Sequence, residues 1–333
     1  MINYKSYSHL SSDIKNNLHK IHIGNYDLVV GFPRSGMIPA HMIALFLNVH
    51  VTDFKSFIDN EPLKCGLTRS VRVNLKKAHD AKKILLVDDS IYSGESLKNS
   101  LNQLSEDLRK KSTTLSIYSN IALRDDIDIY LDVVPTPRVF EWNIFHHSIL
   151  SKACVDIDGV LCVDPTDDEN DDGSKYINFI NNAKPKILPS VKIHSLVTSR
   201  LEKYREHTEA WLKKHNIEYK HLVMLDLPTK EDRIRLKAHA WNKSKYFKEN
   251  KELVFFIESE TKQAHQISQI SAKTVYCVDS NEIINPGLFK FVLNNPENHK
   301  LTLKSYIGHK TPLWLKTLLR PLLKILRNFL RKL

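Results

Sequence analysis

The chain has 333 residues, with 49 Lys and Arg against 38 Asp and Glu and a formal net charge of +11. A chain of this length exceeds the usual size of a single hydrophobic core, so two domains are expected. No stretch reaches the ~18 apolar residues of a membrane span, and the polar N-terminus does not look like a secretory signal. We therefore expect neither a membrane-spanning nor a secreted protein. The cysteines show no CxxC pair or metal-ligand spacing and are expected to be reduced thiols of a cytoplasmic protein: Cys65, Cys154, Cys162 and Cys277.

Residues 26–30 predict a short strand that leads into a turn bracketed by glycines. The turn reads Gly31-Phe32-Pro33-Arg34-Ser35-Gly36, and an apolar helical run follows it as far as Leu47. Such a turn holds one fixed cation in front of a helix N-terminus, which is a favourable place for an anion. Arg34, Ser35 and Gly36 are therefore candidate ligands of a pyrophosphate group.

Residues 84–87 form an unbroken apolar run that ends in Asp88 and Asp89. Such runs are typical of parallel strands covered on both faces, and ligands of open α/β sheets bind at the carboxyl ends of such strands. Asp88 and Asp89 can accept hydrogen bonds from a vicinal diol. The tight loop behind them offers backbone N–H groups and hydroxyls to an anion, and a helix is expected from about residue 95. The loop and first helical turn supply Ser90, Tyr92, Ser93, Gly94, Glu95 and Ser96.

The 84–97 stretch resembles the 5-phosphoribosyl-1-diphosphate (PRPP) signature of type I phosphoribosyltransferases. The turn at 31–36 resembles the pyrophosphate loop of the same family. This resemblance implies that Asp88 and Asp89 hold the ribose 2- and 3-hydroxyls, and that residues 92–96 wrap the 5-phosphate. It also implies a mobile loop that closes over the reacting centre, for which the polar segment 53–74 is the candidate. A solvated basic loop is the alternative interpretation of that segment.

Further strands are expected at 113–123 and 129–134, and an aromatic segment follows them. In the family just named, a terminal hood covers the acceptor. Trp142, His146 and His147 would then contact the acceptor, or else pack at the domain junction. The sequence favours neither interpretation.

A second motif follows a short polar hinge at residues 151 and 152. The strand expected at 153–155 leads into Asp156-Ile157-Asp158-Gly159-Val160-Leu161. The run resembles motif one of the haloacid dehalogenase (HAD) phosphatases. This resemblance implies that Asp156 attacks phosphorus, while Asp158 protonates the leaving alcohol and then activates water.

The remaining parts implied by this second resemblance occur in the expected order. Thr198, after a strand at 193–197, would donate a hydrogen bond to the phosphoryl group. The charge on that group calls for Mg²⁺ and a lysine. The metal is assigned to Asp156, Asp158 and Glu258, and Glu260 is the alternative to Glu258 after the strand at 254–257. A basic helix supplies the lysine: Lys243 is preferred over Lys245 and Lys237.

The segment between motif one and the strand of Thr198 is short, so it holds at most a small cap. It is also acidic, which usually marks a solvated loop; substrate or metal binding is the less favoured interpretation. Its carboxylates are Asp164, Asp167, Asp168, Glu169, Asp171 and Asp172.

Basic residues and leucines alternate at the C-terminal end of the chain, residues 311–333. No Asp or Glu follows Glu297, whereas nine Lys and Arg do. The cations fall on one helical stripe beside a leucine-rich face, which indicates a helix lying in a membrane interface, where anionic lipids contribute ~1 kcal/mol per basic residue. Docking on another protein or on the chain's own core is the alternative. Nucleic acid is not expected, because the leucines need an apolar partner.

Together these patterns predict an α/β protein with two Rossmann-like domains. We expect a type I phosphoribosyltransferase domain with a parallel sheet at 1–150, and a HAD-like phosphatase domain with a doubly wound sheet and a small cap at 151–300. A basic amphipathic tail occupies 301–333. The sequence assigns no oligomeric state.

The expected function is bifunctional and uses Mg²⁺. The first domain would transfer 5-phosphoribosyl from PRPP to an acceptor, and the second would remove the 5-phosphate to leave a ribofuranosyl residue. A tail that binds an anionic membrane suggests a lipid-linked glycan acceptor in bacterial polysaccharide biosynthesis, with the enzyme peripheral on the inner face of the cytoplasmic membrane. The alternatives are a nucleobase phosphoribosyltransferase joined to a nucleotidase, and a regulator that senses PRPP.

Overall fold

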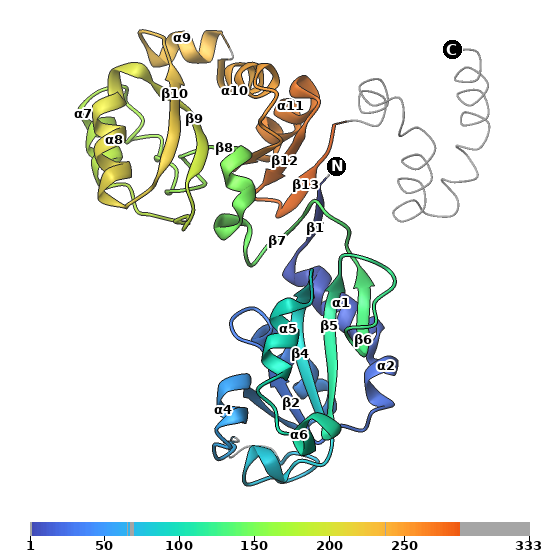
Figure 1. The fold of residues 1–333 in the computed structure, drawn as a ribbon. Helices are drawn as coiled ribbons and strands as arrows, with labels where there is room; N and C mark the ends of the chain where they lie inside the picture. The colour runs from blue at the N-terminus through green and yellow to red at the C-terminus, as the bar shows by residue number, and fades with distance from the viewer. Residues whose placement is uncertain (1, 65, 67–69, 237, 287–333) are drawn as a thin grey trace, which may run out of the picture. The chain divides into compact units, whose positions relative to one another are not determined.

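The computed structural model describes residues 2–64, 66, 70–236 and 238–286, and it shows a mixed α/β protein (Figure 1). The chain divides into two compact units, Met1–His147 and Ser148–Leu333. Each unit is built around its own largely parallel sheet.

The first unit contains a five-stranded sheet in the order β3-β2-β4-β5-β6, in which all neighbouring strands are parallel. Its elements are β1 (Asn3–Lys5), α1 (Tyr7–Asn16), α2 (Leu18–His22), β2 (Leu28–Gly31), α3 (Met37–Leu47), β3 (His50–Asp53), α4 (Phe54–Ile58), the 3-10 helix η1 (Ala78–Asp80), β4 (Ile84–Ile91), α5 (Glu95–Leu101), α6 (Glu106–Lys111), β5 (Ser112–Ser119), β6 (Ile129–Val133), β7 (Arg138–Phe140) and the 3-10 helix η2 (Ile144–His146).

The apolar run of β4 is explained by burial on both faces of this sheet. Leu85 and Val87 belong to the core shared with α1 and α3, whereas Ile84 and Leu86 face the core that contains residues of α4, α5 and α6. Successive side chains of a strand point to opposite faces. A strand between two helical layers therefore needs apolar residues at every position.

Two expected strand boundaries in this unit were wrong. β4 does not end at Val87 but continues to Ile91, so Asp88 and Asp89 lie within the strand. Beyond Val87 the buried positions alternate with partly exposed ones, so the strand goes on after its fully apolar part has ended. β5 ends at Ser119 rather than at residue 123.

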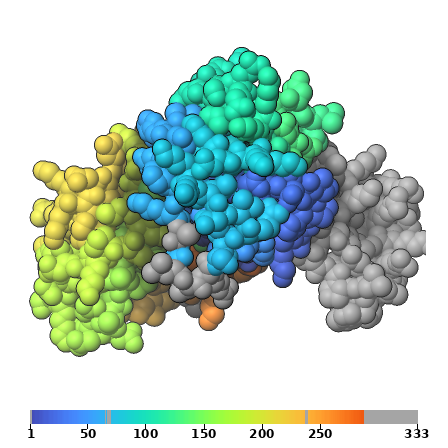
Figure 2. All heavy atoms as spheres, turned by 90° about the horizontal axis from the view of Figure 1, so that it is seen from below, coloured from blue at the N-terminus to red at the C-terminus, as the bar shows by residue number. Residues whose placement is uncertain are grey.

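The two ends of the first unit pair with each other. β1 and β7 form a separate two-stranded parallel sheet in which Tyr4 lies opposite Val139. The segment that follows β7, which contains Trp142, is thereby held next to the N-terminal strand. The segment between β3 and β4 lies at the surface of the unit, in light blue in Figure 2.

The second unit contains a six-stranded sheet in the order β10-β9-β8-β11-β12-β13, with only β13 antiparallel to its neighbour among the described strands. Its elements are the 3-10 helix η3 (Ser148–Lys152), β8 (Ala153–Val155), α7 (Ser174–Asn182), β9 (Ile193–Leu201), the 3-10 helix η4 (Glu202–Tyr204), α8 (Arg205–Lys214), β10 (Tyr219–Leu225), α9 (Lys230–Arg235), α10 (Ala238–Glu249), β11 (Phe255–Glu258), α11 (Thr261–Ser271), β12 (Thr274–Cys277) and β13 (Glu282–Ile284).

Residues of α10 and α11 share a core with the central strands β8, β9, β11 and β12. β9 was expected to end at Val197 but extends to Leu201, so Thr198 and Arg200 are strand residues. Both side chains are buried. The strand therefore carries polar groups into the interior of the unit, where each needs a partner.

No helix among the described residues is long and apolar enough to cross a membrane. Cys154, Cys162 and Cys277 are free and buried. The predicted amphipathic tail, residues 311–333, lies outside the described residues.

Candidate functional sites

The first candidate site lies where the strand order of the first sheet reverses. From β2 the chain moves to β3 on one side, whereas from β4 it moves to β5 on the other. Connections that diverge in this way leave a crevice at the carboxyl ends of the two strands, which is where open α/β sheets bind ligands. The turn at 31–36 follows β2, and Asp88 and Asp89 lie toward the end of β4.

The turn and the carboxylate pair contact each other directly. The Ser35 hydroxyl donates a hydrogen bond of 2.7 Å to Oδ1 of Asp89. A Cβ atom at Gly36 would lie 2.9 Å from Oδ1 of Asp88 and 2.6 Å from the carbonyl oxygen of Phe32, so this position requires glycine. The Arg34 side chain is exposed.

The two carboxylates differ in environment. Burial, and then the charge of Asp89, raise the pKa of Asp88 to about 8. Asp89 is 6% exposed and accepts a second hydrogen bond, from the indole N–H of Trp142, at 2.8 Å to Oδ2. Asp88 is partly exposed, and its raised pKa keeps it largely protonated at neutral pH, so it can donate as well as accept when a diol binds.

The loop between β4 and α5 has a form that suits an anion. Gly94 has a φ of 82°, a region that residues with a Cβ rarely occupy. A Cβ there would also lie 2.0 Å from Oδ2 of Asp126. Tyr92 and Ser93 are exposed, and the Tyr92 carbonyl accepts a hydrogen bond of 2.7 Å from the guanidinium of Arg124.

Arg124 and Trp142 support this site. Motif reasoning gave Arg124 no role, and it left Trp142 either contacting the acceptor or packing at the domain junction. Arg124 pairs with Asp126 as well as with the loop carbonyl. Trp142 stacks on Phe140 at 4.9 Å between ring centroids, and its indole N–H donates to Asp89.

The segment expected to be a mobile lid, 53–74, begins with α4, and residues 65 and 67–69 lie outside the described residues. Asp53 caps this helix by accepting from the backbone N–H groups of Lys55 and Ser56. Arg72 donates to the carbonyl oxygen of Tyr26 at 2.6 Å. The guanidinium of Arg72 is therefore bound to the backbone just before β2.

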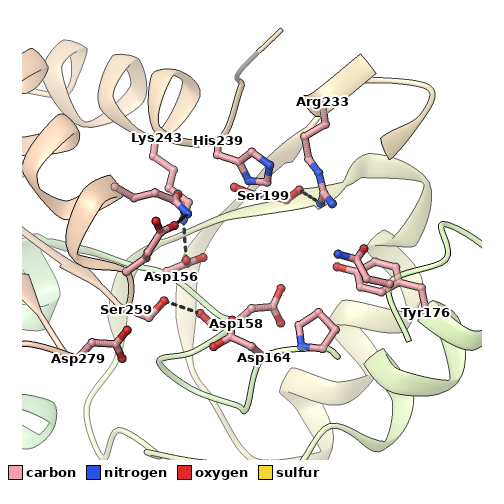
Figure 3. A pocket seen from close by; sticks show the side chains of 14 residues that line it. Asp156, Asp158, Asp164, Tyr176, Ser199, Arg233, His239, Lys243, Ser259 and Asp279 are labelled. Atoms are coloured by element: carbon pink, nitrogen blue, oxygen red, sulfur yellow. Dashed lines mark hydrogen bonds and ion pairs between the residues drawn. The ribbon is translucent and has the colours of Figure 1, made fainter. Parts of the chain in front are cut away.

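The second candidate site also lies at a reversal of strand order, here between β8 and β11. Asp156 follows β8 directly, and Glu258 ends β11. Lys243 of α10 reaches both. Its Nζ donates to Oδ2 of Asp156 at 2.6 Å (Figure 3) and to Oε2 of Glu258 at 2.8 Å. Lys243 is 2% exposed and Lys245 is exposed; Lys237 lies outside the described residues.

Asp158 has a different partner. The guanidinium of Arg200 donates to Oδ1 through Nη2 at 2.6 Å, and its Nε lies 3.1 Å from Oδ2. Arg200 is fully buried and also bonds Thr208 and Cys162. The side chain of Asp158 is therefore held in one orientation by a residue that motif reasoning missed.

Thr198 is buried on β9, and its hydroxyl accepts a hydrogen bond of 3.3 Å from the backbone N–H of Arg200. A hydroxyl that accepts from the chain keeps its own proton free to donate. Glu260 is exposed and accepts from Gln263 at 2.6 Å, whereas Glu258 is fully buried.

The carboxylates of this site are the kind of ligand that Mg²⁺ takes, because Mg²⁺ binds carboxylate oxygens and usually keeps substrate or water ligands. Burial raises the pKa of Asp156 well above its usual value; Lys243 opposes this rise, and Glu258 and Asp158 add to it. A further cation at this point would stabilise the charged carboxylates. Asp156 and Glu258 fit such an ion, whereas the side chain of Asp158 is directed to Arg200. Among the described residues, no group of three or more acidic, His or Cys side chains converges to form a closed cage.

Most of the acidic segment serves local structure. Asp171 accepts from the backbone N–H groups of Gly173 and Tyr176 at the start of α7. Asp172 accepts from the Tyr204 hydroxyl at 2.9 Å and from the backbone N–H of Lys230 at 3.0 Å. In contrast, Asp164 and Asn170 line a cleft beside Asp156.

Comparisons with known proteins find solved structures that match part of the chain. A scan of protein-family models finds no match, and a search among curated proteins finds none either. Solved structures that match include the purine phosphoribosyltransferase from Pyrococcus horikoshii Ot3 (20% identity, TM-score 0.30, 42% of this chain and 92% of that one). Another is the Helicobacter pylori xanthine-guanine-hypoxanthine phosphoribosyltransferase (22%, 0.32, 43% and 95%). A third is the orotate phosphoribosyltransferase from Aeropyrum pernix (17%, 0.26, 38% and 72%). Matches at this identity and TM-score do not assign the chain to a family.

Proposed function

We propose that the first unit transfers a 5-phosphoribosyl group from PRPP to an acceptor. The observation that carries this proposal is the contact between Ser35 of the glycine-bracketed turn and the buried Asp89 of the acidic pair, where the strand order of the sheet reverses. Asp88 and Asp89 would accept from the two ribose hydroxyls. Residues 92–96 would surround the 5-phosphate, and residues 34–36 the pyrophosphate.

In this arrangement the acceptor forms a bond to C1 of the ribose while the bond from C1 to pyrophosphate breaks. Pyrophosphate leaves with the electron pair of that bond, the proton of the acceptor hydroxyl passes to the departing pyrophosphate or to water, and the configuration at C1 is inverted. Arg34 belongs to the turn and has an exposed side chain, which would bind the leaving pyrophosphate. The transition state has oxocarbenium character, and the carboxylates on the diol keep the ring in place as charge develops.

The second unit, in our proposal, is a phosphatase. Asp156 attacks phosphorus and forms an aspartyl-phosphate as the bond from phosphorus to the alcohol breaks and Asp158 protonates the leaving alcohol. Asp158 then removes a proton from a water that attacks phosphorus, which breaks the bond to Asp156 and releases inorganic phosphate. Arg200 holds Asp158 in place, Thr198 donates to a phosphoryl oxygen, and Lys243 balances the charge of Asp156 and Glu258. Mg²⁺ held by Asp156 and Glu258 would neutralise charge on the transferring phosphoryl group.

The two activities make chemical sense in succession. The product of the transfer keeps its 5-phosphate, and the phosphatase would remove it to leave a plain ribofuranosyl group. We propose a lipid-linked glycan as the acceptor in bacterial polysaccharide synthesis. Residues 311–333 would hold the enzyme on the anionic inner face of the cytoplasmic membrane; this part of the proposal rests on sequence alone.

The test is to separate the two steps in the whole chain. With Mg-PRPP and a glycan acceptor, wild type should release pyrophosphate and inorganic phosphate in equal amounts. Asp156→Asn should still release pyrophosphate, and its product should be heavier by one phosphate in mass spectrometry. Wild-type enzyme added afterwards should trim that product. A final product identical to that of wild type would show that the two-step scheme is wrong.

A further inference from the structure

The cleft beside Asp156 extends well beyond the groups that phosphoryl transfer requires. It has a volume of ≈ 350 Å³, near the lower end of the ~300–1,000 Å³ of small-molecule sites. Arg233 and Tyr176 line the part of it away from Lys243, and His239 lies between Lys243 and Arg233 (Figure 3). None of these three has a part in the proposed mechanism.

Arg233 of α9 is buried with an unused donor. The residue is 6% exposed, and its Nη1 donates to the carbonyl oxygen of Ser199 at 2.9 Å. Its Nε has no hydrogen-bond partner within the described part of the chain. Nε has no accessible surface, so a ligand in the cleft does not reach it. The guanidinium faces the cleft in Figure 3, and its Nη groups are the donors that a ligand oxygen there would meet.

The placement of Arg233 is a consequence of how α9 is anchored. Thr229 caps the helix by accepting from the backbone N–H of Asp232 at 3.1 Å. The backbone N–H of Lys230 donates to Asp172, which is itself held by Tyr204. The helix therefore starts at a fixed point, and Arg233 lies one turn further on.

The charges around the cleft decide what kind of group fits beside Arg233. Five carboxylates line it against two cations: Asp156, Asp158, Asp164, Glu260 and Asp279 against Lys243 and Arg233. A second anionic group on the substrate would meet this negative excess. A hydroxyl group, in contrast, can donate to a carboxylate and accept from Arg233 or Tyr176 at the same time.

The aromatic lining argues against a nucleobase. Tyr176 is the aromatic residue other than His239 among the described residues that line the cleft. The residue is 3% exposed, and its ring stacks on that of Phe179 at 5.9 Å and meets that of Tyr204 edge-on at 5.0 Å between centroids. Almost none of the residue is open to the cleft, so its ring offers no platform for stacking.

We infer that the Arg233 side of the cleft is a subsite for an uncharged leaving group rich in hydroxyls, so that the phosphatase acts on sugar phosphates. Arg233 and Tyr176 contact the sugar hydroxyls, and the carboxylates across the cleft accept from them. This inference rests on the proposed phosphatase activity and adds the residues that recognise the sugar of its substrate. It also explains why a cation is buried where the chemistry at phosphorus does not use one.

Four phosphate monoesters test the inference on the whole chain with Mg²⁺: ribose 5-phosphate, p-nitrophenyl phosphate, 3-phosphoglycerate and a nucleoside 5-monophosphate. Wild type should have its highest kcat/KM with ribose 5-phosphate. Arg233→Ala should lower the ratio of kcat/KM for ribose 5-phosphate over p-nitrophenyl phosphate by about 10- to 100-fold, as expected for the loss of a charged hydrogen bond. Arg233→Lys should recover part of the ratio. Arg235→Ala on the same helix is the matched control, because its side chain is 73% exposed, and it should leave the ratio unchanged.

A binding measurement separates recognition from folding. In an Asp156→Asn background, calorimetry should show that Arg233→Ala weakens ribose 5-phosphate binding more than binding of inorganic phosphate. Equal weakening of both, or an equal loss of kcat/KM on every ester, would assign Arg233 to the phosphoryl group and overturn the inference. A wild-type preference for 3-phosphoglycerate or the nucleotide would overturn it as well. Wild type inactive on all four esters would instead remove the proposed phosphatase activity itself.

Discussion

The indole N–H of Trp142 donates a hydrogen bond of 2.8 Å to Oδ2 of Asp89, across 53 positions of sequence. The other oxygen of the same carboxylate accepts from Ser35. Asp89 is therefore held from both sides, by the turn after β2 and by the segment after β7. Each carboxylate oxygen has a second lone pair, so both can still accept from a ribose hydroxyl.

We predict that Trp142→Phe lowers kcat/KM for pyrophosphate release from Mg-PRPP by about 10-fold, because a hydrogen bond to a charged group contributes roughly 1.5–3 kcal/mol. Phenylalanine keeps the contact with Phe140 and removes the donor, so Asp89 is free to turn. Trp241→Phe is the control, since Trp241 is 58% exposed in the second unit. Tighter PRPP binding by Trp142→Phe would mean that this bond has to break when the ribose binds.

Site residues that lie close together in the sequence could be predicted, whereas contacts between distant residues could not. Asp88, Asp89 and Gly94 belong to one continuous stretch with a recognisable spacing, so their chemistry is visible in the sequence. The bonds from Trp142 to Asp89 and from Arg200 to Asp158 join residues 53 and 42 positions apart. Such pairs form only through the packing of the sheet, and no local sequence pattern predicts them.

The lengths of the strands were misjudged for a related reason. The apolar run of β4 stops at Val87, but the strand continues because buried and partly exposed positions alternate as far as Ile91. A polar residue within a strand looks like a loop residue until its position on the sheet is known. The same holds for Thr198 and Arg200 of β9.

The raised pKa of Asp88 predicts a stability that depends on pH. With a folded-state pKa of about 8 and an ordinary unfolded value near ~3.9, the folded state binds the extra proton between those two values. The free energy of unfolding contributed by Asp88 therefore falls as pH rises from about 4 to 8, and levels off above that.

Asp88→Asn removes this effect, so the variant should gain stability relative to wild type as pH rises through that range. Thermal unfolding of the whole chain between pH 5 and pH 9 measures the difference. Glu61→Gln, at an exposed position, should give a difference that does not depend on pH. An Asp88→Asn difference that is flat across the range would mean that Asp88 is charged at neutral pH.

If Asp88 and Asp89 bind the ribose diol, their substitution should impair the transferase activity and leave the phosphatase activity intact. Asp88→Asn combined with Asp89→Asn should lower pyrophosphate release about 10- to 100-fold, since a hydrogen bond to the Asp89 carboxylate contributes roughly 1.5–3 kcal/mol and 1.36 kcal/mol is tenfold in rate. Hydrolysis of p-nitrophenyl phosphate should be unaffected, because the second unit has its own core and its own candidate site. Normal transfer by the double variant would remove the ribose-binding role of the pair.

Lys243 lies between two buried carboxylates, and its removal should affect both stability and chemistry. Lys243→Met leaves Asp156 and Glu258 without the cation that both contact, and breaking a buried pair in this way costs about 3–5 kcal/mol. Hydrolysis of every phosphate ester should be lost. Because burial raises the pKa of Asp156, acid should protonate that carboxyl more readily in the variant. The loss of stability should then be smaller at pH 5 than at pH 8. Lys245→Met, on the same helix but exposed, should match wild type in both measurements. If Lys245→Met abolishes hydrolysis while Lys243→Met retains it, the lysine of the phosphatase is not Lys243.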